Sequence, residues 1–525
     1  MSTEASRTIA RSPRTRPTHF QLSTLDLRPL LLLPLLLLSA PALARGPFEN
    51  NLLSVPGRVN DVVVEDLTGD GLNDLLVVHV VGLPPREKRR ISLFLGPEQG
   101  PPSRKPDQTI PVAELTAAFD VADIDGKPGK ELLLLDRRGL SVVPLTDGRL
   151  GEARRIFEAP TLAGGPEKGN LPRAAFSVPI NGEDSEPALV LPDLGGVLYL
   201  APGSFHAGAD KPDPQRLELE LRYSYRSDFT SSAGPRGQVL TVRATVPGIS
   251  VGDHDGDGNN DLFVLWSDEA DVFERDASGR FKPERVAHYE FDVRTKEEKK
   301  LRNAGVVTQV TDLNADGVSD LLLSKTSGGF MDMKSWLYVY PGLRGGGYGS
   351  KPSQTIKREG FTPVTVCTDL DGDEQDDLIL ASVEIGIFSL SQMLLKSSLT
   401  VNFDLFVIRE GALPKNPTTT VEIPFRISFQ RGADVQGAVP IFGRDFNGDG
   451  RPDLLHGRGV DALEIHLGDR DEDELFQDHF RVRLKAPTSP WMRVGGGDKP
   501  GVVVYYRNIP KLDGKIFWFR NTNPW

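Results

Sequence analysis

Hydrophobic and polar positions repeat in one order along the chain. A short apolar strand leads into an acidic, glycine-rich loop and a leucine-rich strand leaves it, as in VVVEDL and DLLVVHV around the loop that starts at Asp66. A third apolar strand follows, in most copies closed by glycine, and a more polar segment leads into the next copy. Short apolar runs bounded by turn residues are typical of β-strands. The pattern therefore predicts a repeated unit of four short strands.

The acidic loops define the length of this unit. Eight loops can be aligned, with two long intervals between them, and their first positions are residues 66, 123, 180, 253, 312, 369, 445 and 495. Four strands in about 55 residues are typical of a propeller blade, because an isolated four-stranded sheet cannot bury both faces. The sequence predicts an all-β fold, a single β-propeller over residues 45–525, with eight four-stranded blades favoured and seven as the alternative. The long intervals predict insertions near 205–245 and 383–420, the second with apolar residues at helical spacing.

The two ends of the repeat complement each other. The last unit has a third strand, IFWFRN at 516–521, but no fourth, whereas a strand-like segment, NNLLSVPG at 50–57, precedes the first unit. We expect this N-terminal strand to complete the last blade and close the ring, which would remove an exposed sheet edge.

Residues 1–44 have the pattern of an export signal. The first 28 residues hold five arginines, the apolar run LLLLPLLLL occupies 30–38, and Ala42 and Ala44 fit a small-residue cleavage site. The apolar run is about half of the roughly 20 residues that a membrane-spanning helix needs, although an uncleaved anchor is the alternative. No later part of the sequence contains an apolar run long enough to span a membrane, so we expect no transmembrane segment in the mature chain. The predicted location is the periplasm, the cell surface or the medium.

Charge and rare residue types narrow the chemistry. The net charge of −12 argues against nucleic acid as a partner and suits cations. The single cysteine, Cys367, cannot form an intramolecular disulfide, so an exported protein of this size would depend on core burial, bound ions or both. No two histidines have the spacing of zinc ligands, and the sequence predicts no zinc site; the histidines are residues 19, 79, 206, 254, 288, 456, 466 and 479.

Five of the loops follow the pattern DxDxDGxxD closely enough to hold an ion. The side chains at positions 1, 3, 5 and 9 can converge on one point, position 7 adds its backbone carbonyl, and glycine at position 6 permits the sharp turn. Such an all-oxygen, flexible set suits Ca²⁺ better than Mg²⁺, and transition metals favour histidine or cysteine. We expect about five calcium sites, with the ligands Asp66, Thr68, Asp70, Leu72 and Asp74; Asp253, Asp255, Asp257, Asn259 and Asp261; Asp312, Asn314, Asp316, Val318 and Asp320; Asp369, Asp371, Asp373, Gln375 and Asp377; and Asp445, Asn447, Asp449, Arg451 and Asp453.

These loops differ in completeness. The loop from Asp253 keeps all four carboxylates and the turn glycine, whereas Thr68, Asn314 and Asn447 replace the position 3 carboxylate in three others. Glu374 replaces the turn glycine in the remaining loop. We expect the loop from Asp253 to be the strongest site.

Three weaker copies, from Asp123, Ile180 and Gly495, lack the full ligand set. In the first of them Lys127 occupies position 5, so we expect its ammonium group to replace the ion. The sequence therefore predicts ions in five loops and not in eight.

The units resemble the FG-GAP and VCBS-type repeats of integrin α-chain headpieces and of many bacterial exported proteins. Blades of that family carry this DxDxDG loop between their first two strands, and Phe442-Gly443 resembles the Phe-Gly of the name, whereas the Gly-Ala-Pro half is not clearly present. The resemblance covers residues 50–525 and implies bound Ca²⁺. Propellers of this family serve as adhesion surfaces, lectins, parts of surface assemblies and occasionally polysaccharide lyases, so the family alone does not define a function.

The function expected from these observations is that of an exported recognition, adhesion or scaffold module. Its partner would be a protein or glycan on the cell surface or in the envelope. We expect no enzyme, because the sequence shows no nucleophile motif, no histidine-based acid and base pair and no cofactor loop. The alternative is a polysaccharide lyase or other glycan-active enzyme, with Arg222, Tyr223, Tyr225 and Arg226 as its candidate cluster, although RYSYR is also the pattern of a strand edge. An adhesin that binds a ligand carboxylate would need an ion with an open coordination position.

Overall fold

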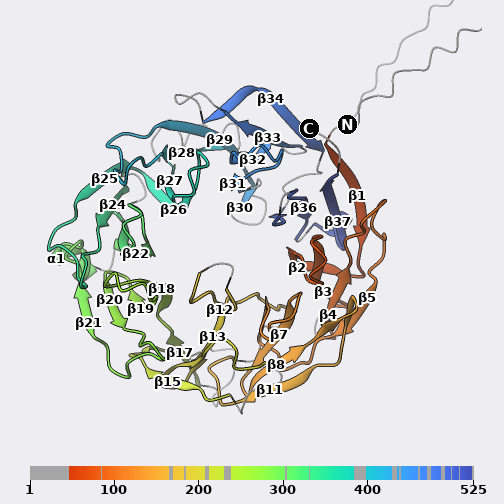
Figure 1. Ribbon diagram of the computed structural model, residues 1–525, viewed down its shortest axis with the longest axis horizontal. Coiled ribbons are helices and arrows are strands. Elements are labelled where there is room, and N and C mark those ends of the chain that lie inside the picture. The colour runs from red at the N-terminus through yellow and green to blue at the C-terminus, as the bar shows by residue number, and fades with distance from the viewer. Residues whose placement is uncertain are drawn as a thin grey trace, which may run out of the picture. The chain divides into compact units, whose positions relative to one another are not determined.

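Eight antiparallel sheets follow one another in chain order and form a ring of blades in the computed structural model (Figure 1). Seven sheets have four strands, and the sixth has a fifth strand. The predicted eight-bladed β-propeller is therefore confirmed. The structure describes residues 47–83, 86–164, 169–182, 185–206, 212–229, 238–301, 304–329, 332–383, 398–428, 434–436, 439–458, 462–469, 475–485, 491–497, 499–507, 509–522 and 525. The predicted export signal and the helical spacing near 387–394 lie outside these residues.

Each blade runs from an inner first strand to an outer fourth strand (Figure 1). The first four blades contain β2 (Arg58–Glu65), β3 (Asp74–Val81), β4 (Lys88–Phe94) and β5 (Gln108–Pro111); β6 (Ala118–Ala122), β7 (Glu131–Asp136), β8 (Gly139–Val143) and β11 (Arg154–Glu158); β12 (Ser177–Val178), β13 (Ala188–Asp193), β14 (Gly196–Leu200) and β15 (Gln215–Glu218); and β18 (Gly248–Gly252), β19 (Asp261–Trp266), β20 (Glu269–Phe273) and β21 (Ala287–Glu290).

The second half of the ring repeats the arrangement. Its blades contain β22 (Ala304–Thr311), β23 (Asp320–Ser327), β24 (Lys334–Tyr340) and β25 (Gln354–Glu359); β26 (Phe361–Thr368), β27 (Asp377–Val383), β28 (Ser398–Phe406), β29 (Thr419–Ser428) and β30 (Asp434–Gln436); β31 (Ile441–Arg444), β32 (Asp453–Arg458), β33 (Ala462–Gly468) and β34 (Phe476–Lys485); and β35 (Trp491–Val494), β36 (Val502–Tyr505), β37 (Lys515–Asn521) and β1 (Phe48–Ser54). Smaller elements are the pair β9 (Leu145–Thr146) and β10 (Arg149–Leu150), α1 (Lys296–Leu301) and the 3-10 turn η2 (Pro510–Leu512). Among the described residues no helix has the length and apolar character needed to cross a membrane.

The inner strands are buried on both faces because each blade stacks on two neighbours. On β3, Leu76 and Val78 pack with side chains of blade 2, whereas Leu75 and Val77 pack with side chains of blade 8. Successive side chains of a strand point to opposite faces of its sheet. A strand between two neighbours therefore needs a largely apolar run, which explains why the second strands are rich in leucine and valine.

The ring closes through the N-terminal strand, as predicted. β1 pairs antiparallel with β37 from Phe48 opposite Asn521 to Ser54 opposite Lys515, and it is the outer strand of blade 8. Leu53 of β1 is fully buried in a cluster with side chains of blades 8 and 1. The terminal segments of the propeller thus share one hydrophobic core.

The connections between strands alternate between the two rims of the ring. In an antiparallel sheet the loops after strands 1 and 3 lie at one rim, and those after strands 2 and 4 lie at the other. The acidic loops follow the first strands, and we call their side the acidic-loop rim. The hairpin of β16 (Arg222–Phe229) and β17 (Gln238–Thr245) follows the fourth strand of blade 3 and therefore belongs to the opposite rim. β27 ends and β28 begins at that rim too, and residues 384–397 between them lie outside the described part of the chain.

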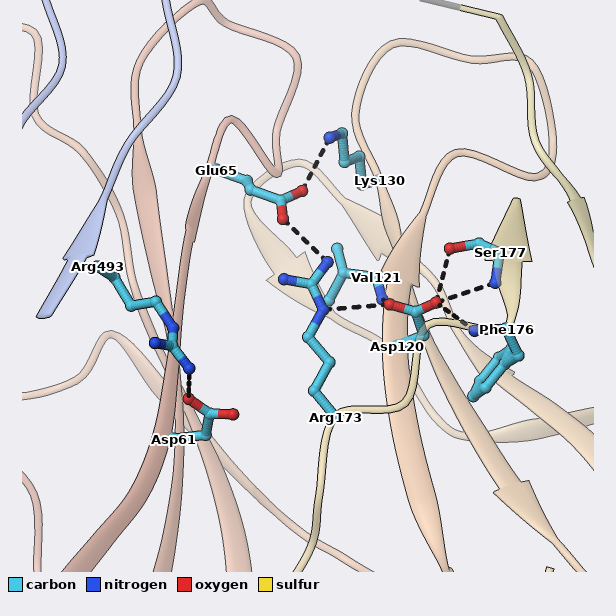
Figure 2. A network of polar contacts seen from close by, with 9 residues as sticks. All are labelled: Asp61, Glu65, Asp120, Val121, Lys130, Arg173, Phe176, Ser177 and Arg493. Carbon is cyan, nitrogen blue, oxygen red and sulfur yellow. Dashed lines mark hydrogen bonds and ion pairs between the residues drawn. The ribbon is translucent and has the colours of Figure 1, made fainter. Parts of the chain in front are cut away.

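Ion pairs tie the inner strands of neighbouring blades together (Figure 2). Arg173, just before β12, donates to Glu65 of β2 over 3.0 Å and to Asp120 of β6 over 3.2 Å. Arg493 of β35 donates to Asp61 of β2 over 2.9 Å. These contacts cross three successive blade boundaries, from blade 8 to blade 3.

Candidate metal-binding loops

The five complete acidic loops lie between the first and second strands of blades 1, 4, 5, 6 and 7. In each, the position 1 aspartate holds the turn by accepting backbone N–H groups. In the loop from Asp253, Oδ1 accepts from Gly256 and Oδ2 from Gly258, both over 2.7 Å. The bond from position 6 to position 1 recurs in the other four loops at 2.8 to 3.0 Å. The loops are therefore five copies of one backbone conformation.

The loop without a turn glycine keeps this conformation. Glycine at position 6 has a positive φ in the other four loops, between 81° and 88°. Glu374 occupies the same position with a φ of 66°, and its N–H still donates to Asp369. A non-glycine residue in the left-handed region costs about 1 kcal/mol or more. The surrounding contacts offset that cost here, so the missing glycine does not remove the loop geometry.

Side-chain oxygens converge in the two of these five loops that have carboxylates at positions 1, 3 and 9, and they also converge in the weaker loop, between Asp123, Asp125 and Glu131. One oxygen each of Asp253, Asp255 and Asp261 lie within 4.8 Å of one another, and the same holds for Asp369, Asp371 and Asp377. At position 3, Oδ1 of Asp371 and Oγ1 of Thr68 are buried with no hydrogen-bond partner among the described residues. Burial and the neighbouring aspartates Asp373 and Asp369 raise the pKa of Asp371, although the nearby backbone N–H of Asp373 lowers it. A cation bound in each of these two loops would supply the missing partner of its position 3 oxygen.

Positions 5 and 7 are coupled through the backbone. The N–H of position 7 donates to the position 5 carboxylate in all five loops, over 2.7 to 3.0 Å. This bond restricts the position 5 side chain, which the sequence predicted as a ligand. The position 7 residues, predicted to ligate through their carbonyls, are Leu72, Asn259, Val318, Gln375 and Arg451.

The position 9 aspartate has a structural role that the sequence did not reveal. In the loop from Asp312, Oδ2 of Asp320 accepts the N–H of Leu313 over 3.0 Å and Oδ1 accepts that of Gly342 over 2.8 Å. The same two bonds, one to position 2 and one to the end of the third strand, occur in all five loops. The carboxylate thereby links the acidic loop, which follows the first strand, to the connection that follows the third strand of the same blade. We call this arrangement the position 9 clamp.

The clamp carboxylates are almost completely buried, with 0 to 3% of each residue exposed. Burial raises their pKa most, the two N–H donors lower it, and the other aspartates of the loop raise it further. The resulting pKa is about 6 for Asp74, Asp261 and Asp320 and about 7 for Asp377 and Asp453. The raised pKa values mean that the ionised form of each position 9 carboxylate is destabilised by burial and by the other aspartates of its loop. A bound cation would stabilise the ionised form.

Neighbouring loops contact each other around the rim. The carbonyl of Asp253 accepts the N–H of Ser319, in the acidic loop of the next blade, over 2.7 Å. The carbonyl of Asp255 accepts from Gly345 of that blade, also over 2.7 Å. An ion that fixed the loop from Asp253 would therefore also hold the boundary between blades 4 and 5.

The weaker loop from Asp123 differs as its sequence indicates. Lys127, at position 5, forms an ion pair with Asp125 at position 3. Glu131 takes the clamp position and accepts the N–H of Ile124 over 3.0 Å, and burial raises its pKa to about 7. The exposed ammonium group thus pairs with one carboxylate of the loop, and its replacement of the ion stays a prediction.

The Arg and Tyr cluster predicted for a glycan-active enzyme is only partly described. The guanidinium of Arg222 lies 4.4 Å from the ring centre of Trp266 and pairs with Glu269 over 2.7 Å. Tyr223 is 49% exposed, and the side chains of Tyr225 and Arg226 lie outside the described part. Arg222 therefore anchors the hairpin to blade 4, which agrees with the strand-edge interpretation of RYSYR.

Comparisons with known proteins give fold likeness only. No protein-family model matches the chain, and no curated protein matches it. Among solved structures, an Agrocybe aegerita lectin described as recognising non-reducing terminal N-acetylglucosamine is 12% identical, covering 82% of this chain and 86% of its own, with a TM-score of 0.34. Sqt1 from Chaetomium thermophilum is 10% identical, covering 89% and 98%, with a TM-score of 0.42. A chain from BBS1N in complex with ARL6DN is 10% identical, covering 91% and 97%, with a TM-score of 0.34. At these values the likenesses assign no family to the chain.

Proposed function

We propose that this protein is an exported, calcium-binding β-propeller of the FG-GAP and VCBS-repeat type that acts as a recognition or scaffold module. Ca²⁺ would occupy the five complete loops and stabilise the ring, while a protein or glycan ligand would bind elsewhere on the propeller. The calcium sites and the ligand-binding face have separate support, and each has its own test.

The observation that carries the calcium proposal is the state of the position 3 oxygens. Asp371 Oδ1 and Thr68 Oγ1 are buried without a hydrogen-bond partner among the described residues, and leaving such an atom unpaired costs about 1–3 kcal/mol. Both oxygens belong to position 3 of the repeated loop, one in blade 1 and the other in blade 6. An ion coordinated by oxygen would satisfy them, and a flexible set of carboxylate, amide and hydroxyl oxygens suits Ca²⁺.

The expected ions are structural because of where the loops lie. Each loop is clamped to its own third strand, and the loop from Asp253 also bonds to the next blade. If each site has a Kd of about 10⁻⁴ to 10⁻³ M, millimolar Ca²⁺ contributes about 0.4–1.4 kcal/mol per site. Five sites would together contribute roughly 2–7 kcal/mol, which is comparable with the whole stability of a domain.

The test of calcium binding is a thermal melt of the protein with millimolar Ca²⁺, with Mg²⁺ and with a chelator. We expect a rise in melting temperature that is selective for Ca²⁺, and about five bound ions by equilibrium dialysis. Asp257→Ala should remove about one ion and part of the rise. Asp276→Ala is the matched control, because Asp276 caps an ordinary turn of the same blade by accepting from Ser278. An unchanged melt in Ca²⁺, or an equal rise in Mg²⁺, would contradict the proposal.

The ligand-binding face is inferred from the insertions. The hairpin of β16 and β17 belongs to the rim opposite the acidic loops, and β27 ends and β28 begins at that same rim. Insertions in repeat proteins often build the binding face. The propeller would thus use one rim for ions and the other for its partner.

This division of the rims predicts separable effects. Replacing residues 222–245 by a short Gly-Ser linker should abolish retention on the glycan or surface-protein array spot that the intact protein recognises. The calcium-dependent melt should persist, because the hairpin forms its own two-stranded sheet outside the blades. Asp257→Ala, tested below the melting temperature, should leave retention intact. Retention that survives loss of the hairpin and fails in Asp257→Ala would place the ligand at the acidic-loop rim instead.

A further inference from the structure

Blade 7 brings two histidines and a glutamate together on one face. His456 of β32 lies directly opposite Glu464 of β33 in the antiparallel register, and His466 is two residues beyond Glu464. Residues two apart on a strand share a face, and diagonal partners across a strand pair are within reach of long side chains. One ligand atom each of these three side chains lie within 4.8 Å of one another.

The two imidazoles meet through the same ring nitrogen. Nε2 of His456 is 3.0 Å from Nε2 of His466. Nδ1 of His456 is 3.0 Å from the carbonyl oxygen of Gly457, and because a carbonyl can only accept, this Nδ1 carries a hydrogen. In the neutral ring, Nε2 of His456 therefore directs a lone pair toward His466. A metal-binding histidine is commonly oriented in this way, with its other ring N–H donated to a backbone carbonyl.

Glu464 is oriented by a second contact. Its Oε1 pairs with Arg458, which leaves Oε2 4.0 Å from Nε2 of His466. The side chain of Glu464 is 4% exposed and that of His466 is 14% exposed. The arrangement fixes one carboxylate oxygen beside the two nitrogens.

The cluster lies on the face of blade 7 that is turned away from blade 8. Leu455, Leu463 and Ile465 point to the opposite face, where they pack with side chains of blade 8. Because side chains alternate, His456, Glu464 and His466 face the boundary with blade 6. The cluster is therefore separate from the acidic loops, whose ligands lie at the rim.

We propose that His456, His466 and Glu464 form a binding site for a first-row transition metal of the Zn²⁺ class. Two imidazole nitrogens and one carboxylate oxygen suit such an ion, with a water or a donor from a ligand as the fourth partner. Tetrahedral coordination at about 2.0–2.1 Å places two nitrogen ligands about 3.3 Å apart, so the observed 3.0 Å needs only a small adjustment. The chain would then bind two chemically different classes of metal at two different places.

The sequence did not reveal this site because strand pairing creates it. His456 and His466 are ten residues apart, a spacing that matches no zinc motif. The contact becomes visible only once the register of β32 and β33 is known, with His456 opposite Glu464. The expectation of no zinc site rested on spacing along the chain, which does not include contacts made across paired strands.

The test is a Co²⁺ and Zn²⁺ titration of the untagged protein in millimolar Ca²⁺, which keeps the acidic loops occupied if they bind calcium. Co²⁺ should produce the visible absorption bands of tetrahedral nitrogen and oxygen coordination, and one equivalent of Zn²⁺ should remove them. His456→Gln and His466→Gln should each weaken Zn²⁺ binding by about 100-fold or more, since changes in the outer shell alone cost 10- to 100-fold. His288→Gln, at an exposed histidine of blade 4, should leave the affinity unchanged.

The intact protein keeps the proposal falsifiable even if a variant does not fold, because the Co²⁺ spectrum needs no substitution. Absence of tetrahedral bands together with no Zn²⁺ binding would overturn it, and the pair would then be a hydrogen bond from Nε2 of His466 to Nε2 of His456. Unchanged Zn²⁺ affinity in both folded glutamine variants would overturn it as well. Neither result bears on the calcium proposal, whose melts contain no transition metal.

Discussion

Asp377→Ala is expected to lower the free energy of unfolding by about 2–6 kcal/mol, with or without calcium. Asp377 is fully buried, and its two oxygens accept the N–H groups of Leu370 and Ile408 over 2.9 and 2.7 Å. Alanine would leave both buried donors without a partner, and each costs about 1–3 kcal/mol. Urea unfolding in Ca²⁺ and in chelator measures the loss under both conditions.

A second aspartate of the same loop is the matched control. Asp373, at position 5, is exposed and accepts one N–H, from Gln375. Asp373→Ala should therefore destabilise the protein in Ca²⁺ and have little effect in chelator. If Asp377→Ala also destabilised the protein only in Ca²⁺, position 9 would stabilise the protein as a metal ligand. The prediction that the position 9 clamp stabilises the protein without calcium would then be wrong.

Asp120→Ala is expected to cost about 2–6 kcal/mol, because it removes the acceptor of two backbone N–H groups at the start of blade 3, each worth about 1–3 kcal/mol. The side chain of Asp120 is 1% exposed. It accepts from Arg173 over 3.2 Å and also from the backbone N–H groups of Phe176 and Ser177, both over 3.1 Å (Figure 2). The first strand of blade 3 is only two residues long, so these bonds are a large part of what holds it to blade 2. Denaturant unfolding measures the change.

Glu65→Gln separates this effect from simple loss of charge. Glu65 pairs with the same Arg173 over 3.0 Å, but its side chain is 23% exposed. Solvent screens such a pair, so the expected loss is at most about 1 kcal/mol. Equal losses in the two variants would mean that the charge of the network, and not the bonds of Asp120 to blade 3, stabilises this boundary.

The blade count and the ring closure were predictable because both depend on local patterns. Each acidic loop marks one unit, and the strand-like segment at 50–57 matched a missing strand in the last unit. The weak copies from Ile180 and Gly495 left seven blades as an alternative, since neither has a full acidic loop. The structure shows complete four-stranded sheets at both, because the apolar runs and not the ligands build a blade.

The contacts that the sequence did not predict are those made across strands and blades. Position 9 was interpreted as a ligand alone, because its second bond is made to a residue far along the chain. In the loop from Asp369, for example, Asp377 accepts the N–H of Ile408, which follows β28. Glu374 replaces the turn glycine of its loop, yet the neighbouring bonds impose the same backbone conformation. The pair of His456 and His466 depends on the register of one hairpin. Such contacts require the three-dimensional arrangement before they can be inferred.

The pairing of β1 with β37 also has a consequence for how the protein folds. Phe48 and Asn521 are partners in this ladder although they stand near opposite ends of the chain, and such distant contacts form slowly because the entropy of loop closure opposes them. During synthesis β1 emerges before any of the other strands and has no partner until β37 has been made. Both strands then expose unpaired backbone groups and the apolar side chain of Leu53, which are features that favour association between chains. Closure of the ring is thus the step at which correct folding and aggregation compete most directly.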